Sequence, residues 1–397
     1  MTDARVIVVG AGPVGLVAAT VLAGAGVPVT VVEAEATAPD GLRASTFHPP
    51  TLDMLDRLGV SAALVEQGLV CPTWQYRDRE GGVVATFDHA LLRDDTAHPY
   101  RLQCEQWRLT RLLRDRLASN PDVTFLYGLR AADVRQDETG VTLTATGADD
   151  VAHLVRGRYL VGADGARSAV RKALGIGFEG MTIPEIFLTV STPYPFHEAF
   201  PDLANIAYLS DPEEWLVLLR NRTLWRVLVP ADPEEPEASM LSDARVEATM
   251  QRVLPKDGPY EIVHRTAYRV HERVAERYVA GRAFLAGDAA HVNNPLGGMG
   301  MNGGIHDAFN LADRIVAAWR GEDADIGRYE RQRRRVALEV VQQTALRNRE
   351  LLNQRDPAVR RAHQDAMRAT AEDPVRHRAF LLRTSMIQSL RDLESVA

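Results

Sequence analysis

The sequence predicts an α/β protein in which a mixed or antiparallel β-sheet domain is inserted into a parallel-sheet domain, and in which the chain ends in helices. Three observations predict this fold. Residues 5–33 read as strand, helix and strand; residues 185–270 alternate with a period of two; and helical periodicity dominates from Ile305 onward. A length of 397 residues is typical of two or three domains, at roughly 150 residues each.

Composition excludes several classes of protein. Hydrophobic residues make up 46% and charged residues 25%, which excludes disordered and fibrous chains. The net charge of −7 argues against a nucleic-acid partner, because phosphate binding relies on an excess of Lys and Arg. With only Cys71 and Cys104, the chain has neither a disulfide framework nor a cysteine-ligated zinc site, and we expect a cytoplasmic location. Residues 6–32 are uncharged, but five glycines and two prolines favour a βαβ unit over a membrane span.

The first βαβ unit carries a dinucleotide-binding pattern. An apolar strand over residues 5–9 leads into Gly10-Ala11-Gly12-Pro13-Val14-Gly15, then a helix over residues 14–25 and a strand over residues 29–32. Gly10 permits the tight turn, Gly12 lets the backbone approach a pyrophosphate, and Gly15 allows close packing of helix on strand. Glu33 lies 18 residues after Gly15, where an acid binds a ribose hydroxyl and repels a 2′-phosphate. The sequence therefore predicts a Rossmann-like domain that holds FAD or NAD rather than NADP.

A second glycine pattern, at residues 298–303, follows Pro295 and a polar loop instead of a buried strand. We therefore expect no second βαβ unit and no second tightly bound nucleotide.

The rest of the chain is organised around this unit. We expect a domain over residues 1–180, with residues 71–100 contributing to the substrate side, a β-rich substrate domain over 181–275, and a return to the first domain with C-terminal helices over 276–397. The expected elements are helices at 51–57, 106–117 and 242–253, a hairpin of 74–79 with 83–88, and strands at 123–127, 141–146, 158–161 and 282–286.

A second hairpin in the middle domain sorts side chains onto two faces. Strands at 215–220 and 223–229 would turn at Asn221-Arg222. Alternation then places Arg220 and Trp225 on one face and Arg226 on the other.

Three elements together resemble the class A FAD monooxygenases of the p-hydroxybenzoate hydroxylase type. The first is the βαβ unit. The second is the stretch 158–171, with Asp164-Gly165, which looks like the family's Asp-Gly motif. The third is Gly287-Asp288 followed by Pro295, Gly297, Gly298 and Gly300, which looks like its Gly-Asp motif and flavin loop. The similarity spans the first domain and its return segment and covers the middle sheet only in outline.

This resemblance implies a non-covalent FAD and assigns residues to it. Asp288 would bind the ribityl chain, and Asp164 would contact FAD and help NADH or NADPH to dock, with Arg171 in support. An N-cap aspartate and an ordinary strand-to-helix turn are the structural alternatives at these two positions. The backbone N–H groups of Met301 and Asn302 would face the polar edge of the ring. The resemblance also implies FAD contacts for Ala34, Arg43, Gln106 and Leu129.

The function implied is hydroxylation of a phenolic or heteroaromatic acid, with O2 and transiently bound NAD(P)H, through a flavin C4a-hydroperoxide. His48 is a candidate base, Arg220 a candidate partner for a substrate carboxylate, and Tyr208 a further pocket candidate. No motif for a metal site occurs. A halogenase or reductase on the same scaffold, and a non-catalytic flavin sensor, stay open, as do the choice between NADH and NADPH and between monomer and homodimer.

Overall fold

The computed structural model describes residues 4–37 and 44–396, apart from the side chains of residues 184 and 185. A central six-stranded sheet forms the core of one half of the molecule. Its strand order is β18-β19-β12-β1-β2-β8, and every pairing is parallel except that of the edge strand β18. The predicted return of the chain to this sheet is confirmed, because β19 pairs with β12. The strands are β1 (Val6–Val9), β2 (Val29–Glu33), β8 (Val123–Tyr127), β12 (Tyr159–Gly162), β18 (Val279–Ala280) and β19 (Ala283–Leu285).

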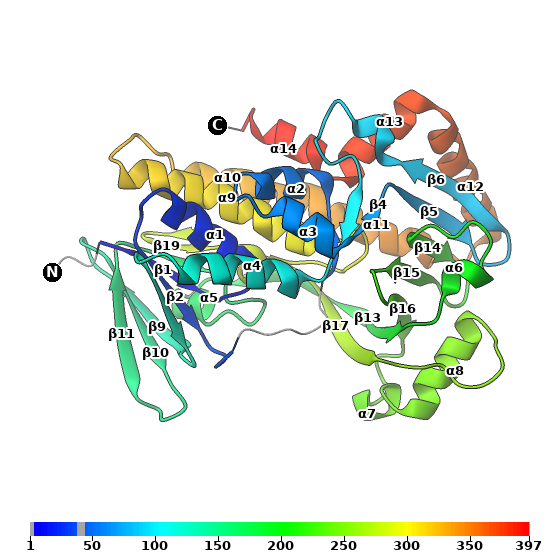
Figure 1. Cartoon of the computed structure of the whole chain (residues 1–397), viewed down its shortest axis with the longest axis horizontal. Coiled ribbons are helices and arrows are strands. Elements are labelled where there is room, and N and C mark those ends of the chain that lie inside the picture. Colours follow the sequence, from blue (N-terminus) through cyan, green and yellow to red (C-terminus); the bar gives the residue numbers. More distant parts are fainter. Residues whose placement is uncertain (1–3, 38–43, 397) are drawn as a thin grey trace.

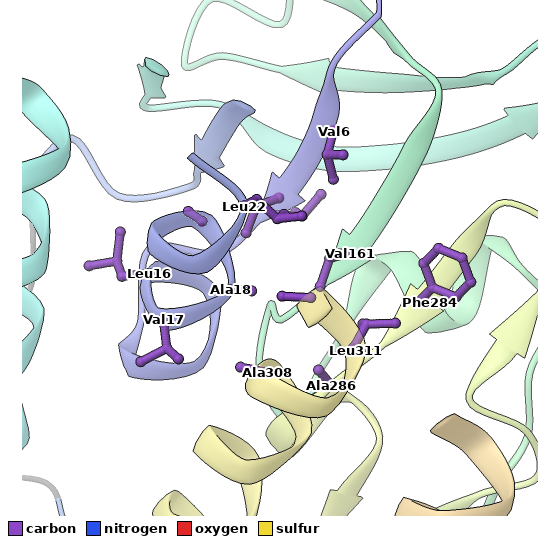
Figure 2. Close-up of a cluster of buried hydrophobic side chains, with 14 of the residues drawn as sticks. Val6, Leu16, Val17, Ala18, Leu22, Val161, Phe284, Ala286, Ala308 and Leu311 are labelled. Carbon is purple, nitrogen blue, oxygen red and sulfur yellow. The ribbon is translucent and has the colours of Figure 1, made fainter. Parts of the chain in front are cut away.

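Helices cover this sheet because their small and branched residues pack on its apolar strands. α1 packs against a long helix, α9, and Figure 2 shows side chains from β1, α1 and α9 meeting in one buried cluster. A three-stranded sheet, β11-β10-β9, projects at the lower left of Figure 1, away from α9 and α10. The elements are α1 (Pro13–Gly24), α2 (Pro49–Asp56), α3 (Ser61–Gln67), α4 (Gln106–Ala118), α5 (Ala169–Ala173), α9 (Met299–Trp319), α10 (Gly327–Val336), β9 (Arg130–Gln136), β10 (Val141–Thr146) and β11 (Ala152–Gly157).

The second half is built on an eight-stranded mixed sheet, which confirms the predicted fold class. Its order is β20-β17-β13-β16-β15-β14-β5-β6, and the predicted hairpin β5–β6 forms one edge. One face packs on α8, and the other packs in part on the C-terminal helices. The elements are β5 (Thr73–Asp78), β6 (Gly82–Asp88), β13 (Phe178–Thr192), β14 (Ile206–Ser210), β15 (Leu216–Arg220), β16 (Trp225–Ala231), β17 (His264–Ala275), β20 (His291–Val292), α6 (Phe196–Ala199), α7 (Glu237–Met240) and α8 (Asp243–Val253).

Two smaller groups of elements join the halves. The short sheet β3-β7-β4 lies between them, and the C-terminal helices pack over β5 and β6 (Figure 1). No helix in the described ranges has the length and apolar character that crossing a bilayer requires. The elements are β3 (Thr46–Phe47), β4 (Leu69–Cys71), η1 (His89–Leu92), β7 (Arg101–Gln103), η2 (Gly287–Ala289), a π-helical segment η3 (Ala337–Gln342), α11 (Gln343–Leu352), α12 (Pro357–Glu372), α13 (Pro374–Thr384) and α14 (Ile387–Leu393).

Two sequence-based predictions need correction. The turn between β15 and β16 contains four residues rather than two, because Arg220 pairs with Trp225; the shift of two keeps the predicted faces. The last helical region begins at Met299, six residues before the predicted start at Ile305. Its glycines lower helix propensity, but a Cβ on Gly304 would lie 2.6 Å from the Val14 side chain, so close packing on α1 requires glycine there.

Candidate active site

One cavity of about 1140 Å³ runs from the carboxyl ends of the central strands to the inner face of the eight-stranded sheet. This exceeds the roughly 300–1,000 Å³ of a usual small-molecule site, so it has room for a cofactor and a second ligand. Another hollow, of about 770 Å³, lies between the C-terminal ends of α1 and α4 and is lined by none of the predicted site residues. The large cavity includes these predicted residues: Gly10, Ala11, Gly12, Pro13, Val14, Glu33, Ala34, Gln106, Leu129, Asp164, Gly165, Tyr208, Asp288, Pro295, Gly298, Gly300 and Met301.

The glycine turn between β1 and α1 has the geometry that a pyrophosphate site needs. Gly10 has φ +104°, and a Cβ there would lie 2.4 Å from the Ala163 carbonyl oxygen. A Cβ on Gly15 would lie 2.0 Å from the Gly10 carbonyl oxygen, so Gly15 serves packing and lies outside the cavity lining. A Cβ on Gly12 would meet no atom within 4 Å, which leaves open space in front of the first turn of α1. Free N–H groups and the helix dipole favour a phosphate in that space.

The tip of β2 forms the next wall of the cavity. The Glu33 carboxylate accepts hydrogen bonds from the Ala11 N–H at 2.7 Å and the Glu35 N–H at 2.9 Å. The Leu129 N–H donates to the Glu33 carbonyl oxygen at 2.9 Å, which brings the end of β8 beside it. The predicted acid, Ala34 and Leu129 therefore meet at one corner of the cavity.

Asp164 has a structural role as well as a place in the cavity wall. Its carboxylate accepts from the Ser168 hydroxyl at 2.6 Å and from the Ala169 and Val170 N–H groups, so it caps α5. Arg171 stacks on the Phe178 ring at 3.8 Å and donates to the Ala289 carbonyl oxygen at 2.9 Å. The Asp-Gly and Gly-Asp segments are thereby tied to each other.

A buried ionic cluster centred on Asp307 supports the Gly-Asp segment. The Gly287 N–H and the His291 Nε2–H donate to one Asp307 oxygen at 3.1 and 2.8 Å, and the Arg333 Nε–H donates to the other at 2.5 Å. Burial opposes ionisation of Asp307, but Arg333 and His291 outweigh it and lower the pKa to about 2. Gly287 itself faces Val14, whereas Asp288 is exposed at the cavity wall.

His48 lies behind the flavin loop. Its Nε2–H donates to the Gly297 carbonyl oxygen at 2.8 Å, and its backbone N–H donates to the Asn302 Oδ1 at 2.9 Å. The Asn302 amide in turn donates to the Thr46 and Gly298 carbonyl oxygens. Burial, and then the nearby Arg101 charge, lower the pKa of His48 well below its usual range. His48, Gly297 and Asn302 thus hold the loop from behind and do not line the cavity.

Two other predicted residues have different outcomes. Gln106 begins α4, and its N–H donates to the Ala44 carbonyl oxygen at 3.0 Å, which places it in the cavity wall. Arg43 lies outside the described residues.

The eight-stranded sheet presents Arg226, not Arg220, to the cavity. Arg220 points to the opposite face, where its guanidinium lies 5.8 Å from the Trp225 ring centre. Arg226 lines the cavity, and burial lowers its pKa, an effect that Glu105 opposes. Alternation along the strands correctly placed the two arginines on opposite faces of the sheet. It could not predict which of the two faces lines the cavity. His264, Thr266 and Tyr268 of β17 are further cavity residues that sequence reasoning missed.

Comparisons with known proteins explain this arrangement. A family model described as FAD binding domain matches residues 3–344. Para-nitrophenol 4-monooxygenase of Pseudomonas sp. (strain WBC-3) is 35% identical over 98% of this chain and 97% of its own length. The chain belongs to the family of FAD-dependent aromatic monooxygenases. Within this family, 6-hydroxy-3-succinoylpyridine 3-monooxygenase HspB of Pseudomonas putida (strain DSM 28022 / S16) is 35% identical over 87% of this chain and 88% of its own. The crystal structure of p-nitrophenol 4-monooxygenase PnpA from Pseudomonas putida DLL-E4 superimposes with a TM-score of 0.92, at 32% identity over 98% of each chain.

The monooxygenase fits FAD on the evidence of its own residues. The open space before α1, the carboxylate at the tip of β2 and exposed Asp288 line one continuous cavity. With FAD bound, the space before α1 would hold the pyrophosphate and the carboxylate would face the adenosine ribose, while the ribityl chain is the role that the sequence resemblance implies for Asp288. The first turn of α9, with Gly300 and Met301, would meet the isoalloxazine ring.

Proposed function

We propose that this monooxygenase hydroxylates a phenolic or heteroaromatic acid in the inner half of the cavity, with NADH or NADPH and O2 as co-substrates. The single observation that carries the proposal is the continuity of the cavity. It leads from the dinucleotide turn of α1 to the inner face of the eight-stranded sheet without a break. Bound FAD would accept a hydride from the nicotinamide and deliver one atom of O2 to the ring.

The inner half suits an aromatic acid in shape and charge. Its wall includes Val217, Leu219, Leu228 and Leu296, which exclude water from the reacting ring. Arg226 supplies positive charge, and a guanidinium is the side chain best matched to a carboxylate or a phenolate. Among the described residues, the carboxylates that line the cavity are those of Glu33, Glu35, Asp164 and Asp288, and none of these four lies on the eight-stranded sheet.

Neutral polar groups complete the wall around the proposed ring. Burial raises the pKa of Tyr268 to about 12, so its hydroxyl stays protonated and can donate to the substrate. Burial, and then the Arg226 charge, lower the pKa of His264, so this imidazole is neutral at neutral pH. These groups can orient a substrate without adding negative charge.

The names of the relatives guide the choice of substrates. The two relatives reported above are named for para-nitrophenol and 6-hydroxy-3-succinoylpyridine, both hydroxylated rings that carry electron-withdrawing groups. The test is to incubate the FAD-loaded enzyme with each of these compounds and to measure NAD(P)H oxidation, O2 consumption and the hydroxylated product together. Equal amounts of product and oxidised nicotinamide support the proposal. Oxidation that yields only hydrogen peroxide with every compound contradicts it.

The proposal includes a cytoplasmic enzyme that is a monomer or a homodimer. Both cysteines are buried and free, which fits a reducing compartment. Light scattering on the FAD-loaded protein distinguishes the two oligomeric states, and a larger assembly would contradict both.

A further inference from the structure

Glu272 is a buried carboxyl group close to the flavin loop, and the proposed reaction does not use it. It lies on β17, is 0% exposed, and its Oε2 atom has no hydrogen-bond partner among the described residues. Burial raises the pKa of this carboxyl group to about 7, so its neutral and ionised forms are both populated near neutral pH. A buried ionisable group that costs free energy in this way indicates a role other than stability.

The Oε1 atom of Glu272 holds the chain where it leaves β20. The ladder between β17 and β20 ends at Val292, which pairs with Arg273. Two positions further on, the Asn294 N–H and Nδ2–H both donate to Glu272 Oε1, at 2.8 and 2.7 Å. The Asn294 Oδ1 then accepts from the Leu296 N–H at 3.0 Å. A single carboxylate oxygen thus takes over from the strand pairing and fixes the path of the residues that follow.

The chain that Glu272 fixes is a wall of the cofactor cavity. All residues from 292 to 301 line the cavity except Gly297 and Met299, and the first turn of α9 at their end would meet the isoalloxazine ring. Asn294 is one of these lining residues. Glu272 does not line the cavity, so it would act on bound FAD through Asn294 and not by direct contact.

The two protonation states of Glu272 hold this wall differently. The ionised carboxylate accepts both bonds from Asn294, and charge-assisted hydrogen bonds are roughly twice as strong as neutral ones. In the neutral acid, the proton lies on Oε2 while Oε1 accepts, which leaves a buried donor without an acceptor. Rotation of the carboxyl group toward an acceptor would break its bonds to Asn294.

The groups that face Glu272 favour its ionised form. The two bonds from Asn294, and then the charge of Arg349 on α11, oppose the effect of burial on its pKa. The residue opposite Glu272 on β13 is the uncharged Met181. Alternation places the two titratable neighbours on the same strand on its other face, and these are His271 and Arg273.

We propose that Glu272 is a positioning residue for the flavin, whose ionised carboxylate holds Asn294 and thereby keeps the wall from residue 292 to 301 in the arrangement that binds FAD. The neutral acid loosens this wall. FAD therefore binds more tightly as Glu272 ionises, and by reciprocity bound FAD favours the ionised form. Direct repulsion between Glu272 and the diphosphate of FAD would have the opposite sign. The inference concerns the cofactor and goes beyond the proposed function, since it holds for any aromatic substrate.

The test measures the dissociation constant of FAD at pH 6 and pH 8 from the change in flavin fluorescence, together with the visible absorption spectrum of bound FAD. We expect the unaltered protein to bind FAD about tenfold more tightly at pH 8 and to show a different flavin spectrum there. Glu272→Gln keeps an oxygen for Asn294 but has a donor in place of Oε2, so it imitates the neutral acid. At both pH values it should bind FAD as the unaltered protein does at pH 6, with a spectrum that does not change.

Glu330→Gln is the matched control. Glu330, on α10, also accepts two backbone bonds on one oxygen, from the Tyr278 N–H at 2.6 Å and the Val279 N–H at 2.8 Å, and it does not line the cavity. This variant should keep the full pH dependence. Asn294→Ala should lose the dependence as Glu272→Gln does, and the double variant should bind FAD at pH 8 no more weakly than Asn294→Ala alone.

Three results would each overturn the proposal: an equal pH dependence in Glu272→Gln and the unaltered protein, an equal loss of it in Glu330→Gln, or tighter binding at pH 6 than at pH 8. Urea unfolding checks that each variant folds. If Glu272→Gln does not fold, Asn294→Ala decides the question by the same readout. None of these results depends on turnover, so the proposed function is tested separately.

Discussion

Replacement of Asp307 by Asn should destabilise the protein far more than a surface substitution on the same helix. Asp307 is fully buried on α9 and accepts from Gly287, His291 and Arg333. The amide keeps the shape of the side chain but removes its charge. Arg333, which is 1% exposed, would then lose its counter-charge.

The size of the effect follows from this burial. Removing one partner of a buried ion pair costs about 3–5 kcal/mol, because the remaining charge stays desolvated. The pKa of Asp307 gives a separate, lower figure for the contribution of its charge to stability. A native pKa of about 2, against 3.8 in the unfolded chain, contributes roughly 2 kcal/mol of stability at neutral pH. This contribution is present above pH 3.8 and is lost as the pH falls through about 2.

Urea unfolding at pH 7, followed by circular dichroism, measures the change. Asp313→Asn is the control, because Asp313 lies on the same helix and forms an ion pair with Arg57 in which both side chains are about half exposed. Such a pair contributes about 0–1 kcal/mol. If Asp307→Asn cost no more than Asp313→Asn, the cluster would not be the structural support described above.

Three further predictions concern the site. Glu272 is buried beside Asn294, and burial raises the pKa of its carboxyl group to about 7. Its ionisation therefore lowers the stability of the fold increasingly as the pH rises from about 4.5 through 7. Urea unfolding should show Glu272→Gln to be more stable than the unaltered protein by about 2–3 kcal/mol at pH 8 and equally stable at pH 4.5. Gly10→Ala forces a Cβ within 2.4 Å of a carbonyl oxygen at φ +104°, so titration with FAD should show binding weakened about tenfold or more, whereas Gly24→Ala, in open space on α1, should bind normally. Arg226→Met should lower kcat/KM for an acidic phenol about tenfold, and an equal loss in Arg220→Met, on the opposite face of the sheet, would contradict the assignment of Arg226 to the cavity.

Local patterns predicted the parts of the site that depend on neighbouring residues. The turn from Gly10 to Gly15 and the acid at Glu33 follow from short spacings, and the structure places them as a βαβ unit requires. Alternation likewise placed Arg220 with Trp225 and on the face opposite Arg226. The domain boundaries stay a prediction.

The parts that sequence reasoning missed depend on distant contacts. Arg101 lies on a strand of three residues whose partners are β3 and β4, and nothing near it in sequence indicates burial beside Tyr208. The support of Gly287 by Asp307 joins residues 20 positions apart in the chain. The early start of α9 also depends on a contact between residues distant in sequence. Close packing of its glycines on α1 offsets the free energy that glycine costs in a helix.

Anaerobic reduction of the FAD-loaded enzyme by NADH or NADPH, with and without an acidic phenol, tests the central claim most directly. We predict that one phenol of the panel accelerates reduction of the flavin by one of the two nicotinamides, and that the hydroxylated phenol forms once O2 is admitted. Reduction that no phenol accelerates would contradict the hydroxylase account and favour a reductase, a halogenase or a sensor on the same scaffold. A protein that cannot be loaded with FAD would contradict the account at its first step.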